Sequence, residues 1–213
     1  MSGATHTTDL RTGRTVWQSH RPRLPGSSRL GRSIRTDVLV VGAGISGALA
    51  AEALTADGFD VVIVDRRRPV AGSTMASTAL LQYEIDIPLT HLARQVGLHR
   101  AQRIWRRSRL ALEGLRARTR ELGIDAALEE RDSLYLDGNV LPPRQLEREA
   151  TARRLAGFEV AFLSAAEVRA RFGFRGRSAI LGFDNLVGDP VRLAAGYLRA
   201  AVGRGARLYS LSR

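Results

Sequence analysis

The sequence predicts an α/β fold that opens with a parallel strand–helix–strand unit. A short run of apolar and β-branched residues, 37–41, is followed at once by glycines at 42, 44 and 47, which open a helical segment, Ile45–Ala56. A second β-branched run, 60–64, ends in an acidic residue, Asp65. Strand, helix and strand within about thirty residues make one right-handed crossover unit of a parallel sheet.

The first strand is expected to be buried on both faces, because unbroken apolar runs are typical of parallel sheets. The helix after it should end at Asp57-Gly58, where glycine favours a turn. Residues 38–56 together approach the length of a membrane span, but three glycines and Glu52 interrupt them. We therefore expect a buried strand and a helix there, and no membrane span.

The rest of the chain alternates helices and strands, with no internal repeat. Ser164 and Glu167 have the spacing of a capping box, and Asp189-Pro190 resembles the N-cap and first residue of a helix. Helices are predicted over residues 89–97, 101–122, 144–155, 165–172 and 190–203, and strands over 133–136, 158–163, 178–183 and 206–211.

The chain is strongly basic, with 33 basic and 21 acidic residues and a net charge of +12. Every basic residue is arginine, and the charge is spread along the chain, so we expect no nucleic-acid partner. In helix 101–122 most arginines fall outside the apolar stripe and predict a solvated face. The absence of cysteine excludes disulfides and thiolate metal sites, and we predict no metal site.

Residues 1–35 are rich in Ser, Thr, Gly, Arg and Pro and show no apolar period. This composition predicts a flexible basic arm, and it lacks the apolar core of a secretory signal. It resembles an organellar transit peptide, but Trp17 and the Arg-Pro-Arg-Leu-Pro stretch equally suit an arm on the domain surface. We expect a cytoplasmic protein.

The glycine pattern at residues 42–47 predicts a dinucleotide-binding site in a Rossmann-like fold. Gly42 permits the tight turn, Gly44 lets the backbone approach a pyrophosphate, and Gly47 lets the helix lie close to the sheet. The phosphates would sit on the amides of Ile45 and Ser46 at the helix N-terminus, where the helix dipole favours negative charge.

Asp65 is placed to accept hydrogen bonds from the ribose hydroxyls of an adenosine. Arg66, Arg67 and Arg68 would suit the 2′-phosphate of NADP, but the carboxylate before them argues against a second anion there. We expect the three arginines to form mainly a solvated turn, with Arg66 near the adenine or a phosphate.

Residues 36–65, the segment 72–81 (Gly-Ser-Thr-Met-Ala-Ser-Thr-Ala-Leu-Leu) and the later Gly-Asp-Pro-Val-Arg-Leu at 188–193 together resemble the D-amino-acid oxidase and glycine oxidase family of FAD-dependent oxidoreductases, called the DAO family. The resemblance covers most of residues 36–211. It implies FAD as the cofactor.

The resemblance implies a division of the chain. The flexible arm would span 1–35, the FAD-binding βαβ unit and flavin loop 36–86, the beginning of an inserted α+β substrate domain 87–185, and a return to the FAD-binding domain 186–213. A complete member of the family would continue past Arg213, so the fold is expected to be incomplete and a partner chain is expected to supply the missing half.

The resemblance also places the small hydroxylated residues Ser73, Thr74, Ser77 and Thr78 near the pyrophosphate, ribityl chain or flavin ring. Such residues donate hydrogen bonds without blocking a planar ring. The next polar residues, at 82, 84 and 86, and Tyr83 are expected to be structural, and His91 and His99 ordinary surface or core histidines.

The chemistry that the resemblance implies is oxidation of an amine or amino acid by hydride transfer to flavin N5. No nucleophile or obligatory base is visible, so no catalytic residue is named. Two alternatives remain open: an NAD(P)-dependent dehydrogenase with the same glycine pattern, and an FAD-binding fragment without turnover. The long helical stretch after Thr78 speaks against the dehydrogenase, whose fold would continue with a prompt strand–helix repeat.

Overall fold

A computed structural model describes residues 15–20 and 22–212 of the chain, which form two compact units. Unit 1 contains the described residues up to Thr78, the short segment Leu122–Ala126, and the residues from Asp189 onward. Unit 2 contains Ala79–Glu121 and Ala127–Gly188. Each unit is therefore built from stretches that are separated in sequence.

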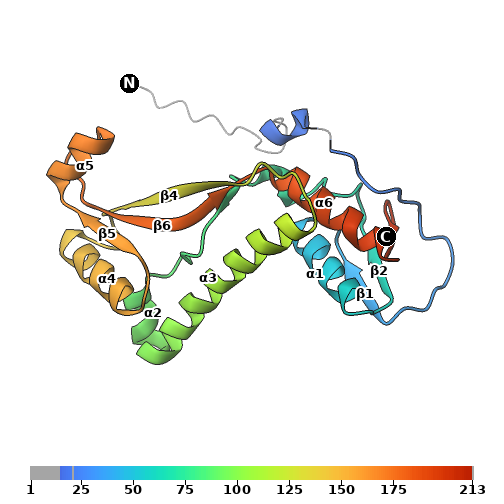
Figure 1. The fold of residues 1–213 in the computed structure, drawn as a ribbon, viewed down its shortest axis with the longest axis horizontal. Helices are drawn as coiled ribbons and strands as arrows, with labels where there is room; N and C mark the ends of the chain where they lie inside the picture. The colour runs from blue at the N-terminus through green and yellow to red at the C-terminus, as the bar shows by residue number, and fades with distance from the viewer. Residues whose placement is uncertain (1–14, 21, 213) are drawn as a thin grey trace, which may run out of the picture. The chain divides into compact units, whose positions relative to one another are not determined.

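Unit 1 is built on a three-stranded parallel sheet with the order β1-β2-β7 (Figure 1). The helix α1 connects β1 to β2 and packs against both strands and against α6. The elements are β1 (Val38–Val41), α1 (Ile45–Ala56), β2 (Val61–Val64), α6 (Pro190–Gly203) and β7 (Arg207–Tyr209), with two 3-10 helices, η1 (Val16–Ser19) and η2 (Ser73–Ala76). The predicted crossover unit is confirmed.

The two faces of β1 differ, which corrects the expectation that it is buried on both. Val40 faces α1, since its Cγ1 lies 3.3 Å from where a Cβ on Gly47 would stand. Leu39 and Val41 point the other way and are 55% and 79% exposed. In the part of the chain that the structure describes, no element covers that face. β2, which lies between two strands, is buried from Val61 to Ile63.

The described part of the N-terminal arm is bound to unit 1. Ser28 forms a parallel bridge with Tyr209, and Ser27 and Ser210 share a hydrogen bond of 2.8 Å between their hydroxyls. The Trp17 indole donates to the Ser77 carbonyl at 2.8 Å. Trp17, Ser27 and Ser28 therefore lie on the surface of unit 1, while residues 1–14 and 21 of the expected flexible arm lie outside the described residues.

Unit 2 is built on a four-stranded antiparallel sheet centred on its longest strand, β6 (Ala179–Val187). β4 pairs along one edge of β6, with an irregularity between Arg131 and Ser133, while β3 and β5 pair with opposite ends of the other edge. The remaining elements are β3 (Leu80–Leu81), α2 (Leu89–Val96), α3 (Leu98–Glu121), β4 (Glu129–Leu136), α4 (Pro143–Leu155), β5 (Val160–Leu163) and α5 (Ala165–Phe172).

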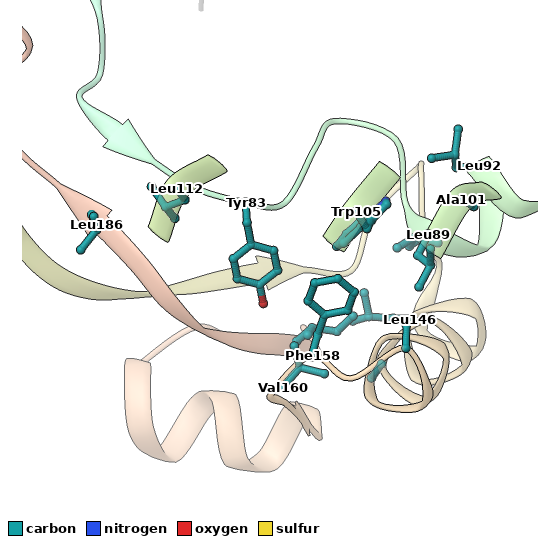
Figure 2. Packing of buried hydrophobic residues seen from close by; sticks show 14 residues of the cluster. Tyr83, Leu89, Leu92, Ala101, Trp105, Leu112, Leu146, Phe158, Val160 and Leu186 are labelled. Atoms are coloured by element: carbon teal, nitrogen blue, oxygen red, sulfur yellow. The ribbon is translucent and has the colours of Figure 1, made fainter. Parts of the chain in front are cut away.

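The main core of unit 2 is aromatic at its centre (Figure 2). The rings of Tyr83 and Phe158 stack with centroids 5.3 Å apart, and Trp105 meets Phe158 edge-on at 5.6 Å. Leu89 and Leu146 complete the packing from α2 and α4, and both are fully buried. Such aromatic pairs add to the stabilisation from apolar burial itself.

The helices follow their sequence signals closely. Ser164 and Glu167 form the predicted capping box, and Asp189 accepts hydrogen bonds from the amides of Val191 and Arg192, both at 2.9 Å, as the predicted N-cap of α6. The short elements η1, η2 and β3 were not predicted. β4 and β6 extend beyond their predicted ends, because their outer residues depend on pairing with each other.

Candidate functional site

A tight turn joins β1 to α1, and glycine is required in it. Gly42 has a φ of 109°, a region that L side chains rarely adopt, and its amide donates to the Val64 carbonyl at 2.7 Å. A Cβ on Gly47 would lie only 1.8 Å from the Gly42 carbonyl oxygen. The first turn of α1 therefore lies against the end of the strand, as only glycine allows.

The N-terminus of α1 carries no negative charge of its own. Gly44 is its N-cap, and there is no acidic residue in the first turn. The Ile45 amide donates to the Thr74 hydroxyl at 3.0 Å, and a Cβ on Gly44 would stand 3.1 Å from that hydroxyl. The helix dipole favours a phosphate at such a place, where it would compete with the Thr74 hydroxyl for the Ile45 amide.

The carboxylate of Asp65 lies at the glycine turn. One oxygen accepts a hydrogen bond from the Ala43 amide at 2.7 Å, and the other accepts one from the Arg67 amide at 2.8 Å. The backbone of Asp65 is held as well, because its amide donates to the Tyr209 carbonyl of β7 at 2.9 Å. The acidic residue at the end of β2 is thus fixed beside the start of α1.

The loop after Asp65 is hydrogen-bonded to the same glycine turn. The Val70 amide donates to the Ala43 carbonyl at 2.9 Å, and Val70 is buried with a φ of 66°, an unusual conformation for a β-branched residue. The three arginines before it, 66–68, are exposed, as expected. The loop therefore packs against the glycine turn, and the guanidinium groups of residues 66–68 are exposed beside it.

These residues surround a cavity of about 440 Å³ within unit 1. Its wall is partly apolar, from the ends of β1 and β2, and carries one carboxylate and two arginines. The lining residues are Val41, Gly42, Gly44, Val64, Asp65, Arg66, Arg67, Gly72 and Ser212.

The structure brings most of the predicted site residues to this place. Gly42, Gly44, Asp65 and Arg66 line the cavity; Ile45 and Thr74 are hydrogen-bonded beside it, Gly47 packs behind the turn, and Ser46 is exposed on the first turn of α1. The other three are not among the lining residues: Ser73 and Thr78 are exposed, and Ser77 accepts the Trp17 hydrogen bond through its carbonyl.

The sequence did not single out Arg67, Gly72 and Ser212 as cavity residues. The Arg67 amide is oriented by Asp65, and Ser212 arrives from beyond β7, where its amide donates to the Asp65 carbonyl at 3.1 Å. Of these three residues, only Arg67 could have been identified from its local sequence, because it follows Asp65 by two residues. The approach of Ser212 depends on long-range strand pairing, which no local pattern encodes.

A glycine turn against a helix N-terminus, with a carboxylate from the next strand beside it, defines a dinucleotide-binding domain of the Rossmann type. A family model described as "FAD dependent oxidoreductase", the DAO family, matches residues 37–213. The chain belongs to this family of FAD-dependent oxidoreductases.

Solved structures with the same fold include a glycine oxidase and an L-amino acid deaminase. Glycine oxidase from Geobacillus kaustophilus is 26% identical, with a TM-score of 0.60 over 84% of this chain and 47% of that one. L-amino acid deaminase from Proteus vulgaris is 19% identical, with a TM-score of 0.66 over 88% of this chain and 48% of that one. The chain thus spans about half the length of these solved relatives.

A curated relative is YhfW of Bacillus subtilis (strain 168), whose name is that of a Rieske 2Fe-2S iron-sulfur protein. It is 26% identical over 145 residues, which are 68% of this chain and 28% of that protein. A Rieske cluster needs two cysteine ligands, and the 213 residues here contain no cysteine. The shared region is therefore not one that holds such a cluster in this chain.

The cavity fits the ADP half of FAD. Gly42 and Gly44 line the cavity without a side chain that would fill it, and the Asp65 carboxylate and the two arginines match ribose hydroxyls and a diphosphate in chemistry.

Among the described residues, no group of three or more His, Asp or Glu side chains is arranged to hold a metal ion. No helix in the described part of the chain is long and apolar enough to cross a membrane.

Proposed function

We propose that these residues bind FAD for an oxidoreductase that acts on an amine or amino acid. The observation that carries the proposal is the pair of hydrogen bonds that fixes Asp65 beside the glycine turn, at 2.7 and 2.8 Å. This arrangement matches a ribose–diphosphate unit, and membership of the DAO family selects FAD over NAD(P).

Each predicted residue has a role in this proposal. Gly42 and Gly44 leave space for the diphosphate, and Gly47 lets α1 start close to the strand. The diphosphate binds at the start of α1 to the amide of Ser46 and, in place of the Thr74 hydroxyl, to the amide of Ile45. Asp65 accepts hydrogen bonds from the adenosine ribose, and Arg66 lies over the adenine or beside a phosphate. The hydroxylated residues Ser73, Thr74, Ser77 and Thr78 serve the ribityl chain and the flavin.

The proposed substrate class rests on the relatives. Glycine oxidase from Geobacillus kaustophilus, at 26% identity, supports an amine bonded to the carbon that is oxidised. FAD, when bound, supplies the hydride acceptor for that carbon. The residues of this chain orient the cofactor and keep its charged half out of water, and no catalytic residue is assigned to them. We also predict that a partner chain supplies the missing half and that the protein is cytoplasmic.

The test is to purify the chain, record its visible absorption and identify what it releases on denaturation. A yellow protein that releases FAD supports the proposal. A colourless protein that takes up added NAD or NADP but not FAD would contradict it and favour the dehydrogenase alternative.

The substrate class is tested next, by anaerobic addition of glycine, other amino acids and simple amines to the flavin-loaded chain. Bleaching of the flavin by one of them supports the proposed class. Glycerol 3-phosphate is the matched control, because an α-glycerophosphate oxidase from Mycoplasma pneumoniae shares the fold with a TM-score of 0.66. Bleaching by glycerol 3-phosphate alone would reject amine oxidation, and a flavin that no substrate bleaches would leave an FAD-binding chain without turnover.

A further inference from the structure

The described part of the N-terminal arm, residues 15–20 and 22–35, is bound to the elements that form the cofactor cavity of unit 1. It has one anchor at η2 and a second at the end of β7. Ordering a segment of this composition costs conformational entropy, which its contacts must offset. The two anchors therefore indicate what the arm holds in place.

Trp17 in η1 forms the first anchor, at the end of η2. Its indole N–H donates to the carbonyl of Ser77, the C-cap of η2, at 2.8 Å. Trp17 is half-buried, whereas its neighbours Val16 and Gln18 are exposed. The indole therefore joins η1 to η2.

η2 extends from this anchor to the start of α1. Thr74, three residues before Ser77, is buried, and its hydroxyl accepts a hydrogen bond from the Ile45 amide at 3.0 Å. That amide is one of the two to which we assign the diphosphate. Since Thr74 and Ser77 belong to one short turn, a shift of Ser77 would move Thr74 as well. Trp17 is therefore linked to the diphosphate site through η2.

His20 connects Trp17 to α6. The two rings meet edge-on with centroids 5.5 Å apart, and the His20 amide donates to the Trp17 carbonyl at 3.1 Å. The His20 ring pairs through Nδ1 with the carboxylate of Asp189, which is 3% exposed and caps α6. The indole is therefore held beside a buried group of unit 1.

The second anchor joins the arm to the residues that follow β7. The Ser210 amide donates to the Ser28 carbonyl at 2.9 Å. The Leu30 amide donates to the Ser212 hydroxyl, also at 2.9 Å. Ser212 lines the cofactor cavity, and its amide donates to the Asp65 carbonyl at 3.1 Å. This anchor therefore ends on a residue of the cavity wall.

We propose that the arm is a clamp on the cofactor site and that Trp17 is a positioning residue for FAD. Neither Trp17 nor Leu30 lines the cavity, so each acts through another residue that contacts or lines it. The inference rests on the proposed function, because FAD is taken as the occupant of the cavity. By linkage, an attached arm that strengthens FAD binding is itself held more tightly, by the same factor, when FAD is bound.

Trp17→Phe tests the first anchor, because it keeps an aromatic ring and removes the N–H donor to Ser77. The variant should bind FAD about threefold to tenfold more weakly, as expected for the loss of one hydrogen bond. Quenching of flavin fluorescence measures the affinity. Gln18→Ala changes an exposed neighbour in η1 and should bind FAD like the parent. Equal affinity of Trp17→Phe and the parent, or equal weakening in the two variants, would overturn the proposal.

A merely structural role for Trp17 has a different signature. It would lower the melting temperature of the flavin-free chain and leave the FAD affinity of the folded chain unchanged. The clamp predicts a lower affinity with a melting temperature close to that of the parent, since the hydrogen bond of the indole is exposed.

Trypsin reports separately on the attachment of the arm, by cleaving after Arg23 and Arg29. Both side chains are exposed, and the Arg23 carbonyl accepts a hydrogen bond from Arg199 at 2.6 Å. The peptide bond after Arg29 includes the Leu30 amide, which is bound to Ser212. Cleavage at either site requires detachment, and when detachment is faster than cleavage the rate follows the detached population. Saturating FAD should therefore slow both cleavages at least about threefold.

Trp17→Phe should be cleaved faster than the parent after Arg23, and FAD should protect it less. Arg175, in an exposed loop of unit 2 before β6, provides the reference, since cleavage there should not differ between the two proteins. Cleavage of the arm that FAD leaves unchanged in the parent would overturn the proposal.

Failure of the clamp and failure of the proposed function give different results. A chain that binds FAD with the same affinity in the parent and in Trp17→Phe keeps the proposed function and loses the clamp. A chain that takes up no FAD loses both.

Discussion

Asp65 accepts a hydrogen bond from the amide of Ala43 at 2.7 Å, which joins the carboxylate after β2 to the turn after β1. Ala43 is fully buried, so its amide has no access to water as a substitute. The same carboxylate that we assign to the ribose therefore also stabilises the turn that receives the diphosphate. Binding and local stability depend on one side chain.

Replacement of Asp65 is expected to separate these two effects. Asp65→Ala should lower the free energy of unfolding by about 1–3 kcal/mol, because the Ala43 amide is left unsatisfied. Asp65→Asn keeps one acceptor and should be less destabilised, while both variants should bind FAD at least about tenfold more weakly. Thermal unfolding and quenching of flavin fluorescence measure the two quantities. Asp57→Ala, an exposed residue after α1, is the control, and FAD affinity in Asp65→Asn equal to that of the parent would contradict the assigned role.

Gly47 should tolerate no side chain. Gly47→Ala places a Cβ 1.8 Å from the Gly42 carbonyl oxygen, so α1 must shift away from the strand. We expect a loss of about 1–3 kcal/mol or more in the free energy of unfolding, together with loss of FAD binding. Gly203→Ala in α6 is the matched control, since a Cβ there meets open space and should be neutral or slightly stabilising. Wild-type stability and FAD affinity in Gly47→Ala would show that the turn is not packed as described.

The buried pair of Arg153 and Glu149 in unit 2 should be sensitive to loss of one partner. Arg153→Met leaves Glu149, which is fully buried, without its cation, and should cost about 3–5 kcal/mol of unfolding free energy. The double variant Arg153→Met with Glu149→Gln should recover part of this loss. Arg116→Met, which breaks an exposed pair with Glu130, should cost less than about 1 kcal/mol. Denaturant unfolding provides the values, and equal losses in the two arginine variants would contradict the proposed importance of burial.

The stability contributed by Glu149 should depend on pH. Burial by itself raises the pKa of this carboxyl, but hydrogen bonds from Thr90 and Arg153 outweigh it and hold the pKa below its ordinary value. A carboxyl with a lowered folded pKa stabilises the protein above its unfolded pKa and loses that contribution as the pH falls through the folded value. The difference in melting temperature between the parent and Glu149→Gln should therefore shrink between about pH 7 and about pH 3. A difference that grows on acidification would contradict this sign.

Asp189 should stabilise unit 1 as the N-cap of α6. It accepts hydrogen bonds from the amides of Val191 and Arg192 and is 3% exposed, so Asp189→Ala should cost about 1–2 kcal/mol of unfolding free energy. Asp189→Asn should recover most of the loss, since asparagine is an equally good N-cap. Asp125→Ala removes an exposed carboxylate that pairs with Arg192 and serves as the control. Equal stability of the alanine and asparagine variants, measured by thermal unfolding, would rule out capping as the cause.

The parts of the fold that the sequence predicted well depend on neighbouring residues. The glycine turn, the capping box of Ser164 and the N-cap at Asp189 each work through contacts within a few residues, so their spacing is visible in one segment. The two-residue strand β3 was missed because its partner residues in β6 lie more than a hundred positions away. The exposure of Leu39 was missed because a strand sequence carries no record of what covers its two faces.

The same reasoning applies to the candidate site and to contacts within unit 2. Gly42, Gly44 and Asp65 could be predicted because the crossover unit brings them together by itself. In unit 2, Glu84 lies directly against β6 because Gly182 has no side chain there; a Cβ on it would stand 2.3 Å from Glu84 Oε1. No spacing rule connects residues 84 and 182, so this contact required the tertiary structure.

The pairing of β2 with β7 has a consequence for how the chain acquires its structure. The Asp65 amide finds its acceptor only in Tyr209, so the edge of the first sheet stays open until nearly all of the described chain has been synthesised. Closing so long a loop is entropically costly, and contacts of this separation slow folding. While β7 is still missing, the nascent β1–α1–β2 segment therefore exposes an unpaired strand edge, a feature that favours aggregation and chaperone binding.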